Sequence, residues 1–353
     1  MDAQKTAEMP KVKKETKNKI RVEFEDRTPL KERLKKKLLS SYFWTNIVWY
    51  IFRFALMIGI SYVILFPFLS KIAGSFMGPE DFVDITVRIV PKHFTFDTYK
   101  AIFLENKYME AFFNTALLSV LCAVLQTFVS CLVGYGLAKF KFKGRSLVFA
   151  FVIFTMIVPH ETLRLALQLR FRYFDLGGIQ TIKIPGLIGI FGDSINLINS
   201  FWPLIIMSIT GLAFKNGLYI FMMRQFFSGV PDELEESAYV DGSGTLRTFF
   251  KIILPLSIPM MITIFLFSFS WQWTDNFYTN IFFPTSSKYL MMPKIVESVP
   301  PTLAAAALPA GQSLYYMAIK NTCGIMIIMP LVIVYLFCQK YLVQGIERSG
   351  IVG

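Results

Sequence analysis

The chain has 353 residues, of which 54% are hydrophobic and 17% are charged. Soluble domains carry about a quarter charged residues, so this composition excludes a soluble protein and predicts a polytopic membrane protein. The net charge of +12 does not require a nucleic-acid partner, because basic residues gather where membrane topology places them. The four cysteines all lie in apolar stretches, and two histidines are too few for a multi-histidine metal site. A disulfide framework is therefore not expected.

Residues 1–44 form a polar, basic segment ahead of the first apolar block. Leu30, Leu34 and Leu38 recur at helical spacing among lysines and arginines. Such a pattern is typical of an amphipathic helix on an anionic lipid surface. A solvated run of charges that only sets the topology fits the pattern equally well. We expect a basic cytoplasmic N-terminal segment, followed by a membrane domain over residues 45–353.

Six apolar blocks follow, and a membrane-spanning helix needs about 20 largely apolar residues. The third block is shorter than this, and the fourth contains Lys215 and Arg224. The sequence predicts an all-α protein with six transmembrane helices. The expected spans are 47–69, 112–137, 147–159, 203–226, 256–277 and 322–341.

The distribution of Lys and Arg predicts which loops face the cytoplasm. The segment 1–44 is basic, and so is the loop 139–145, which contains no acid. Both are expected inside. With six spans, the loop 228–255 and the C-terminus then also lie inside, whereas 71–110, which is rich in Asp and Glu, lies outside.

The loop 228–255 is a polar interval between two apolar blocks. Pro231 suits the first turn of a helix, where its missing N–H would have no partner, and acidic residues that favour the helix dipole follow it. Gly242 and Gly244 predict the end of this helix, and 246–254 predicts a second short helix. An ordinary capped loop is the simplest interpretation of this helix–Gly–helix pattern.

The spacing within this loop favours a more specific interpretation. Glu236-Ser237-Ala238 is followed after three residues by Gly242, after nine more by Ile252, and then by Leu254-Pro255. This pattern resembles the EAA motif of the permease subunits of ATP-binding-cassette importers, with Ser237 where the family usually has Ala. The wider text resembles the carbohydrate branch of that family, the maltose-type permeases, over most of residues 50–353.

The resemblance implies that the loop contains a coupling helix that docks in a groove of a separate ATPase subunit. Glu236 would pair with a basic group there, Leu234 and Ala238 would pack into the groove, and Gly242 would allow a close turn. The residues assigned to this coupling role are Leu234, Glu236, Ser237, Ala238, Asp241, Gly242, Leu254 and Pro255.

The same resemblance implies the partners and the place of action. They are a second permease subunit, two ATPase subunits, an extracytoplasmic substrate-binding protein and a carbohydrate, in a bacterial cytoplasmic membrane with both termini inside. The chain has no G-x-x-x-x-G-K-[ST] loop, which is the motif that cradles ATP phosphates. ATP and Mg²⁺ are therefore expected on the partner ATPase, with no cofactor or metal in this chain.

A cluster of aromatic and polar residues, 271–277, closes the fifth apolar block. Polar side chains within a span usually face the interior of the bundle, and aromatic rings stack on sugar rings. Trp273 is expected to line a sugar pathway with Gln272, Asp275 and Asn276, while Trp271 meets lipid or a neighbouring helix. An interfacial tryptophan belt with helix-capping polar groups is an equally good interpretation.

The sequence thus predicts the permease subunit of an ATP-driven, binding-protein-dependent carbohydrate importer. The alternative is a secondary transporter or channel without an ATPase. That class usually carries acidic relays within its spans, and here only Asp275 qualifies. A membrane enzyme would need paired carboxylates, a nucleophile beside a histidine, or metal ligands in the spans, and the sequence offers none of these groupings.

Overall fold

The computed structural model describes residues 41–174, 195–284, 288–307 and 313–348, together with two short strands. The strands, β1 (Lys14–Glu15) and β2 (Arg21–Val22), pair antiparallel. Everything longer is helical, which confirms the all-α class. The expected amphipathic helix over 30–38 lies outside the described residues. The chain divides into two units, Met1–Leu69 and Ser70–Gly353.

Most of helix α2 (Ser41–Gly74) belongs to the first unit. It has 34 residues, which correspond to about 50 Å at 1.5 Å per residue. No residue of α2 is buried, although its surface is largely apolar. The helix is long and apolar enough to span a membrane. Within it, Arg53 lies over the ring of Trp49.

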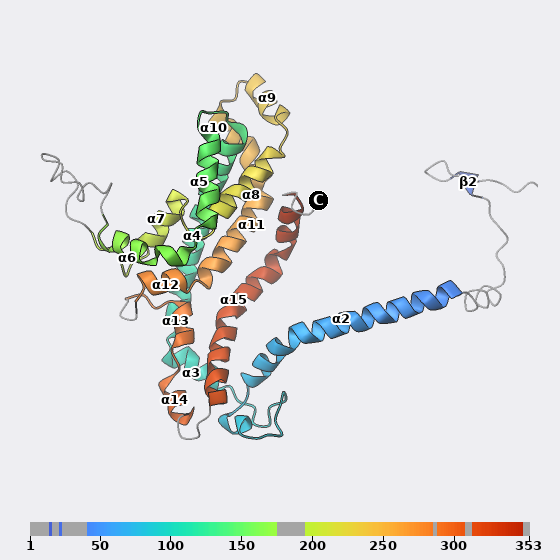
Figure 1. The fold of residues 1–353 in the computed structure, drawn as a ribbon, viewed down its shortest axis with the longest axis vertical. Coiled ribbons are helices and arrows are strands. Elements are labelled where there is room, and N and C mark those ends of the chain that lie inside the picture. Colours follow the sequence, from blue (N-terminus) through green and yellow to red (C-terminus); the bar gives the residue numbers. More distant parts are fainter. Residues whose placement is uncertain are drawn as a thin grey trace, which may run out of the picture. The chain divides into compact units, whose positions relative to one another are not determined.

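The second unit is built on long helices that pack side by side (Figure 1). Helix α4 contacts both α8 and α11, and α11 also contacts α15. At Gly134 of α4, an added Cβ would lie 2.5 Å from the Cβ of Met223 on α8. A glycine is therefore needed where these two backbones approach each other, as is common between membrane helices. The bounds are α4 (Tyr108–Lys139), α8 (Asn216–Ser228), α11 (Leu254–Trp273) and α15 (Ser313–Arg348).

The third and fourth expected spans are broken helices. Helix α5 (Arg145–Ile157) is followed by the 3₁₀ turn η2 (His160–Leu163) and α6 (Arg164–Arg172). The chain bends by 93° at this break, because Pro159 disfavours helical backbone at the residue before it.

The expected span 203–226 is divided into α7 (Trp202–Thr210) and α8 by Gly211 and Lys215, both of which have positive φ. The prediction of an uninterrupted helix here was wrong, because the apolar pattern does not reveal such a break. The described part contains four helices long enough to span a membrane, or five with the bent pair. The count of six is thus not confirmed.

Short helices gather at one end of the second unit, opposite helix α9 (Figure 1). The side chain of Asn106 donates to the carbonyl of Ser298, and Phe82 packs against Tyr315. These contacts join segments far apart in the sequence. The elements are η1 (Pro79–Phe82), α3 (Asp97–Glu105), α13 (Met292–Glu297) and α14 (Pro301–Ala307). Helix α12 (Phe277–Phe282) instead contacts α6.

The opposite end of the second unit carries α9 (Glu233–Val240) and α10 (Thr245–Thr248). One turn of π-helix, η3 (Phe249–Ile253), joins α10 directly to α11. The sequence predicts a separate short helix over 246–254, and this is incorrect. These residues form the start of a continuous helical stretch, Thr245–Trp273.

Candidate functional site

The coupling segment, residues 228–255, forms an elbow whose helix α9 lies beyond the ends of α8 and α11 (Figure 1). The backbone carbonyl of Asp232 accepts hydrogen bonds from the N–H groups of Glu235 and Glu236, which begins the helix. Gly242 has a φ of +77°, a conformation that glycine adopts without steric cost. The expected helix–Gly–helix geometry is therefore present.

Helix α9 has an exposed face and a buried face. Leu234, Glu236, Ser237 and Asp241 are exposed, and Gly242 lies at the exposed turn. Ala238 is instead 4% exposed. Of the two apolar side chains expected to dock on another subunit, only Leu234 is thus available at the surface. Leu254 packs partly against the core beneath the elbow, and Pro255 is exposed in the first turn of α11.

Lys139, the last residue of α4, ties the elbow to the bundle. Its ammonium group donates to the carbonyl oxygen of Val230 at 2.6 Å and to the carboxylate of Asp232. The Lys139 side chain is 6% exposed. Its hydrogen bond lowers the pKa of Asp232 below the usual value for an aspartate. The C-terminus of α4 and the start of α9 are therefore joined by a charge-assisted contact.

An aromatic core lies beneath α9. Tyr135 of α4 packs against Phe227 and Phe249, with ring centroids 5.5 and 4.8 Å away. Glu235 is only 8% exposed and faces inward, so this acidic residue is not part of the docking surface. Glu235 and Lys139 could not be assigned to this site from the sequence, because only the fold shows which charged side chains of a polar stretch point towards the bundle.

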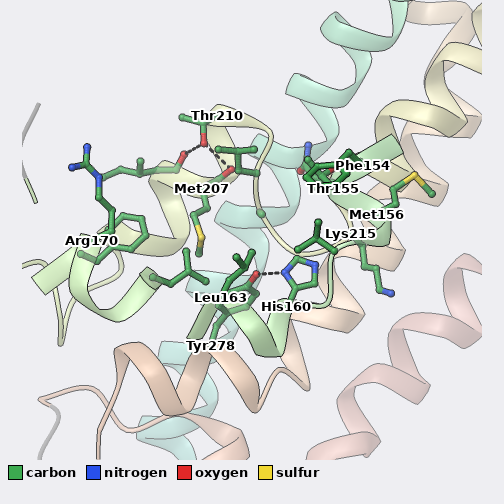
Figure 2. Close-up of a pocket in the computed structure, with 18 of the residues that line it drawn as sticks. Phe154, Thr155, Met156, His160, Leu163, Arg170, Met207, Thr210, Lys215 and Tyr278 are labelled. Carbon is green, nitrogen blue, oxygen red and sulfur yellow. Dashed lines mark hydrogen bonds between the residues drawn. The ribbon is translucent and has the colours of Figure 1, made fainter. Parts of the chain in front are cut away.

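A second candidate site lies where three helix breaks meet in the second unit. His160 follows the break after α5, Phe214 and Lys215 form the break between α7 and α8, and Tyr278 follows the end of α11. The hydroxyl of Tyr278 and Nδ1 of His160 are 2.8 Å apart (Figure 2). Non-helical backbone at membrane depth is tolerated where it is buried in protein or lines a water-filled cavity, so this convergence is a candidate site.

The ring of Phe214 lies at the centre of the three breaks. Its centroid is 4.9 Å from that of His160 and 5.3 Å from that of Trp271. The ammonium of Lys215 lies 5.0 Å from the Phe214 ring and 4.9 Å from the Trp271 ring. We name His160, Phe214, Lys215, Trp271 and Tyr278 the break cluster. It combines a cation with aromatic faces.

A cavity of about 600 Å³ adjoins the break cluster (Figure 2). Its walls are mainly apolar side chains of α5, α6, α7 and α8, with His160, Tyr278 and Asn216 among the polar residues. Asn216 is fully buried, and its Nδ2 donates to the hydroxyl of Ser130 on α4. Small-molecule sites commonly have this character, with apolar walls and a few polar groups.

Buried polar side chains also cross the bundle beside the break cluster. Gln126 on α4 donates to the hydroxyl of Ser208 at 3.3 Å and accepts from the hydroxyl of Ser268 at 3.0 Å. These groups occupy helices that are otherwise apolar, so their hydrogen bonds offset the cost of burying them. They join α4, α7 and α11 next to the polar pocket formed by Gln126, Phe214, Ser268, Trp271, Gln272, Asp275 and Tyr278.

The structure places the two tryptophans of the fifth span differently from the expectation. Trp273 is 1% exposed, packs against Phe112 and Phe269, and donates a hydrogen bond to the carbonyl of Ile327 at 2.9 Å. Trp271 is partly exposed and belongs to the break cluster. The side chain on which a sugar could stack is therefore Trp271, because Trp273 holds α11 against α4 and α15.

The polar residues around these tryptophans have separate roles. Gln272 is 9% exposed and lines the polar pocket. Asp275 accepts hydrogen bonds from the backbone N–H groups of Tyr278 and Thr279, so it caps α12. Asn276 is exposed and pairs with Asn280. The helix-capping interpretation therefore holds for Asp275. Among the described residues, no group of three potential metal ligands is present.

Comparison with known proteins decides the family. The model of the binding-protein-dependent transport system inner membrane component family matches residues 126–348. The chain belongs to this family. It is a multi-pass permease component of ATP-binding-cassette transport systems, as the EAA pattern indicates.

Named relatives align along most of their length. Protein LplC of Bacillus subtilis (strain 168) is 29% identical over 84% of this chain and 92% of its own length. The polygalacturonan/rhamnogalacturonan transport system permease protein YtcP of the same organism is 27% identical over 86% of this chain and 97% of its own. The arabinooligosaccharides transport system permease protein AraQ, also from that organism, is 29% identical over 83% of this chain and 92% of its own.

The fold is also that of a solved importer. A bacterial ABC transporter involved in the import of the acidic polysaccharide alginate matches with a TM-score of 0.65 and 20% identity, over 84% of this chain and 97% of that chain. At this identity the likeness establishes the fold, which supports the class expected from the sequence.

Proposed function

We propose that this permease carries an oligosaccharide or polysaccharide fragment across the bacterial cytoplasmic membrane, together with a second permease subunit. The named relatives are transport permeases for arabinooligosaccharides and for polygalacturonan/rhamnogalacturonan, and the matching structure belongs to an importer of alginate. These names agree on carbohydrate but include both uncharged and acidic sugars. They support the substrate class and leave the charge of the sugar open.

The break cluster is the proposed sugar contact of this chain. Trp271 and Phe214 offer aromatic faces. The cavity of about 600 Å³ lies on the side of the cluster formed by His160, Lys215 and Tyr278. Helix breaks at the level of a binding site are a recurring arrangement in transporters, where they present backbone groups and side chains to the cargo. The residue proposed to stack on the sugar is thus Trp271, and not Trp273 as expected from the sequence.

Helix α9 is the proposed point of contact with the ATPase subunits, which bind ATP and Mg²⁺. The observation that carries this proposal is the exposed face of α9, which presents Leu234 and Glu236, while Lys139 ties the start of the elbow to the bundle. Closure of the ATPase pair would move α9, and the contact through Lys139 would pass the motion to α4. The end that bears α9 then faces the cytoplasm, and the opposite end meets the substrate-binding protein. A secondary transporter or channel has no ATPase subunit, so that alternative does not account for the exposed face of α9.

Purification and charge reversal test this proposal together. The tagged permease should co-purify with an ATPase subunit that carries a nucleotide-binding loop. Glu236→Lys should abolish sugar-stimulated ATP hydrolysis by the reconstituted complex while the protein still inserts. Glu236→Asp keeps the carboxylate at the same position and should retain most of the stimulation. Stimulation equal to wild type in Glu236→Lys would remove Glu236 from the coupling role.

A further inference from the structure

Lys215 has no negatively charged partner among the described residues. It belongs to the break in the fourth apolar block, and helix α8 continues for 13 residues beyond it, about 20 Å towards the coupling segment. Its ammonium contacts the faces of Phe214 and Trp271, and no carboxylate of the described chain forms an ion pair with it. A cation at membrane depth is costly and usually marks a functional site. The ligand that would compensate this charge is therefore an anion, which the described residues do not supply.

The acidic side chains on the segments that carry the break cluster, Glu161 beside His160 and Asp275 between Trp271 and Tyr278, are used elsewhere. Asp275 directs both carboxylate oxygens at the N–H groups that begin α12. Glu161 is exposed beside His160 in the turn η2. Neither forms a salt bridge with Lys215, so the positive charge over the aromatic faces is uncompensated within the described second unit.

The backbone at this break adds to the positive potential. Lys215 is the N-cap residue directly before α8, with a φ of +61°, so the positive end of the α8 dipole lies at the break. Helix N-termini favour anions, and half-helices in transporters direct them at anionic cargo. The ammonium and the helix dipole therefore favour the same kind of ligand.

A buried acceptor beside Lys215 indicates a ligand that also carries hydroxyl groups. Asn216 is fully buried and lines the cavity, and its Oδ1 has no hydrogen-bond partner within the described chain. Leaving a buried acceptor without a hydrogen bond destabilises the fold. A hydroxyl donor of a bound sugar would satisfy it, whereas a small inorganic anion without hydrogen would not.

We propose that Lys215, the N-terminus of α8 and Trp271 form a subsite for the carboxylate-bearing unit of an acidic oligosaccharide, so that the sugar carried by this permease is a uronate oligomer. The carboxylate pairs with the ammonium of Lys215, and the pyranose ring stacks on Trp271. The Oδ1 atom of Asn216 accepts a hydrogen bond from a sugar hydroxyl. This inference rests on the proposed carbohydrate import and specifies the charge of the cargo.

The test uses the complete complex in proteoliposomes with its binding protein, and two pairs of labelled trisaccharides. Each pair has an acidic and a neutral member of the same stereochemistry: trigalacturonate with galactotriose, and trimannuronate with mannotriose. The wild type should take up an acidic member and not its neutral counterpart. Lys215→Gln removes the charge and keeps most of the side-chain length, so it should reduce that uptake about tenfold, since a charge-assisted hydrogen bond contributes about 1.5–3 kcal/mol.

Two further variants separate a charge effect from a folding effect. Lys215→Arg should retain most of the uptake, because it keeps the cation. Lys320→Gln is the matched control, because Lys320 on α15 also lies over an aromatic ring, at 5.0 Å from Tyr316, but outside the break cluster. It should behave like the wild type.

The outcomes distinguish this inference from the proposed function. Uptake of neutral members alone would overturn the acidic subsite and leave carbohydrate import standing. Acidic uptake that Lys215→Gln does not alter would also overturn the subsite. If none of the four sugars entered while the complex hydrolysed ATP, both the subsite and carbohydrate import would be contradicted.

Discussion

The ammonium of Lys139, at the end of α4, donates to both the carbonyl of Val230 and the carboxylate of Asp232, at the start of the coupling segment. Lys139 is nearly buried and Asp232 is 77% exposed. The hydrogen bond therefore reaches from the protein interior to the surface of the elbow. Because α4 also contacts α8 and α11, this contact would connect the proposed movement of α9 to the centre of the bundle.

Replacement of Lys139 should uncouple the elbow from α4. Lys139→Gln removes the charge that Asp232 and the Val230 carbonyl share, and the loss of stability should be small because Asp232 is largely solvated. We expect faster amide hydrogen exchange in residues 230–241 and a lower ratio of sugar transported to ATP hydrolysed. Lys143→Gln, in the exposed loop that follows α4, is the control. Equal exchange in the two variants would show that Lys139 does not hold the elbow.

The crossing of α4 and α8 should depend on Gly134. A Cβ at this position would lie 2.5 Å from the Met223 Cβ and 2.9 Å from the backbone nitrogen of Arg224, so Gly134→Ala must separate the helices. Overpacking of this kind costs about 1–3 kcal/mol. Gly136, two residues later on the same helix, has nothing within 4 Å of an added Cβ. Thermal unfolding in detergent should therefore show a lower midpoint for Gly134→Ala than for Gly136→Ala. The reverse order would contradict this packing.

Features of the fold that depend on local backbone preferences could be predicted from the sequence. Pro231 and Gly242 specify where the coupling helix begins and ends, because proline and glycine act through their own backbone preferences. The break at Lys215 was not predictable, because Gly211 is a weak local signal inside a strongly apolar stretch. The break cluster was also not predictable. His160, Phe214 and Trp271 are separated by more than 50 residues in the chain, and only packing brings them together.

A pH-dependent contact stabilises the turn between α2 and α3. His93 and Asp81 form a hydrogen bond of 2.7 Å between Nδ1 and a carboxylate oxygen, and the backbone N–H of His93 donates to the same carboxylate. This bond to Asp81 raises the pKa of His93. Burial acts to raise the pKa of Asp81, but the hydrogen bonds from His93 outweigh it and lower that pKa.

The direction of the pH effect follows from these shifts. The contribution of His93 is complete below about 6.5, its unfolded value, and is lost as the pH rises through the raised pKa. The contribution of Asp81 is complete above about 3.9 and is lost as the pH falls through the lowered pKa. Amide exchange in residues 76–95, corrected for intrinsic rates, should show more protection at pH 6 than at pH 8.5. His93→Gln should remove this difference, whereas α3 should show none in either protein. A pH difference that persists in His93→Gln would assign the effect to another group.

Substitutions of the two tryptophans at the end of α11 should affect different properties, namely stability for Trp273 and sugar affinity for Trp271. Trp273→Ala removes a ring packed between Phe112 and Phe269 and should cost about 3–5 kcal/mol of stability, seen as a lower unfolding midpoint and less assembled complex. Trp273→Phe keeps most of the packing and loses the hydrogen bond to Ile327, for a cost of about 1 kcal/mol. In both variants, the half-saturation concentration of whatever complex assembles should match the wild type.

Trp271→Ala should give the opposite result. Trp271 is partly exposed and contacts Phe214, Tyr219 and the ammonium of Lys215, so its loss leaves a smaller cavity in the fold. The lost stacking surface is worth about 1 kcal/mol, which raises the half-saturation concentration for sugar uptake several-fold. The measurement is uptake against sugar concentration at matched amounts of assembled complex, and Trp271→Phe should restore most of the affinity. If Trp273→Ala changed the half-saturation concentration and Trp271→Ala did not, the sugar would contact the face of α11 that this structure buries, and the transporting state would require α11 to rotate.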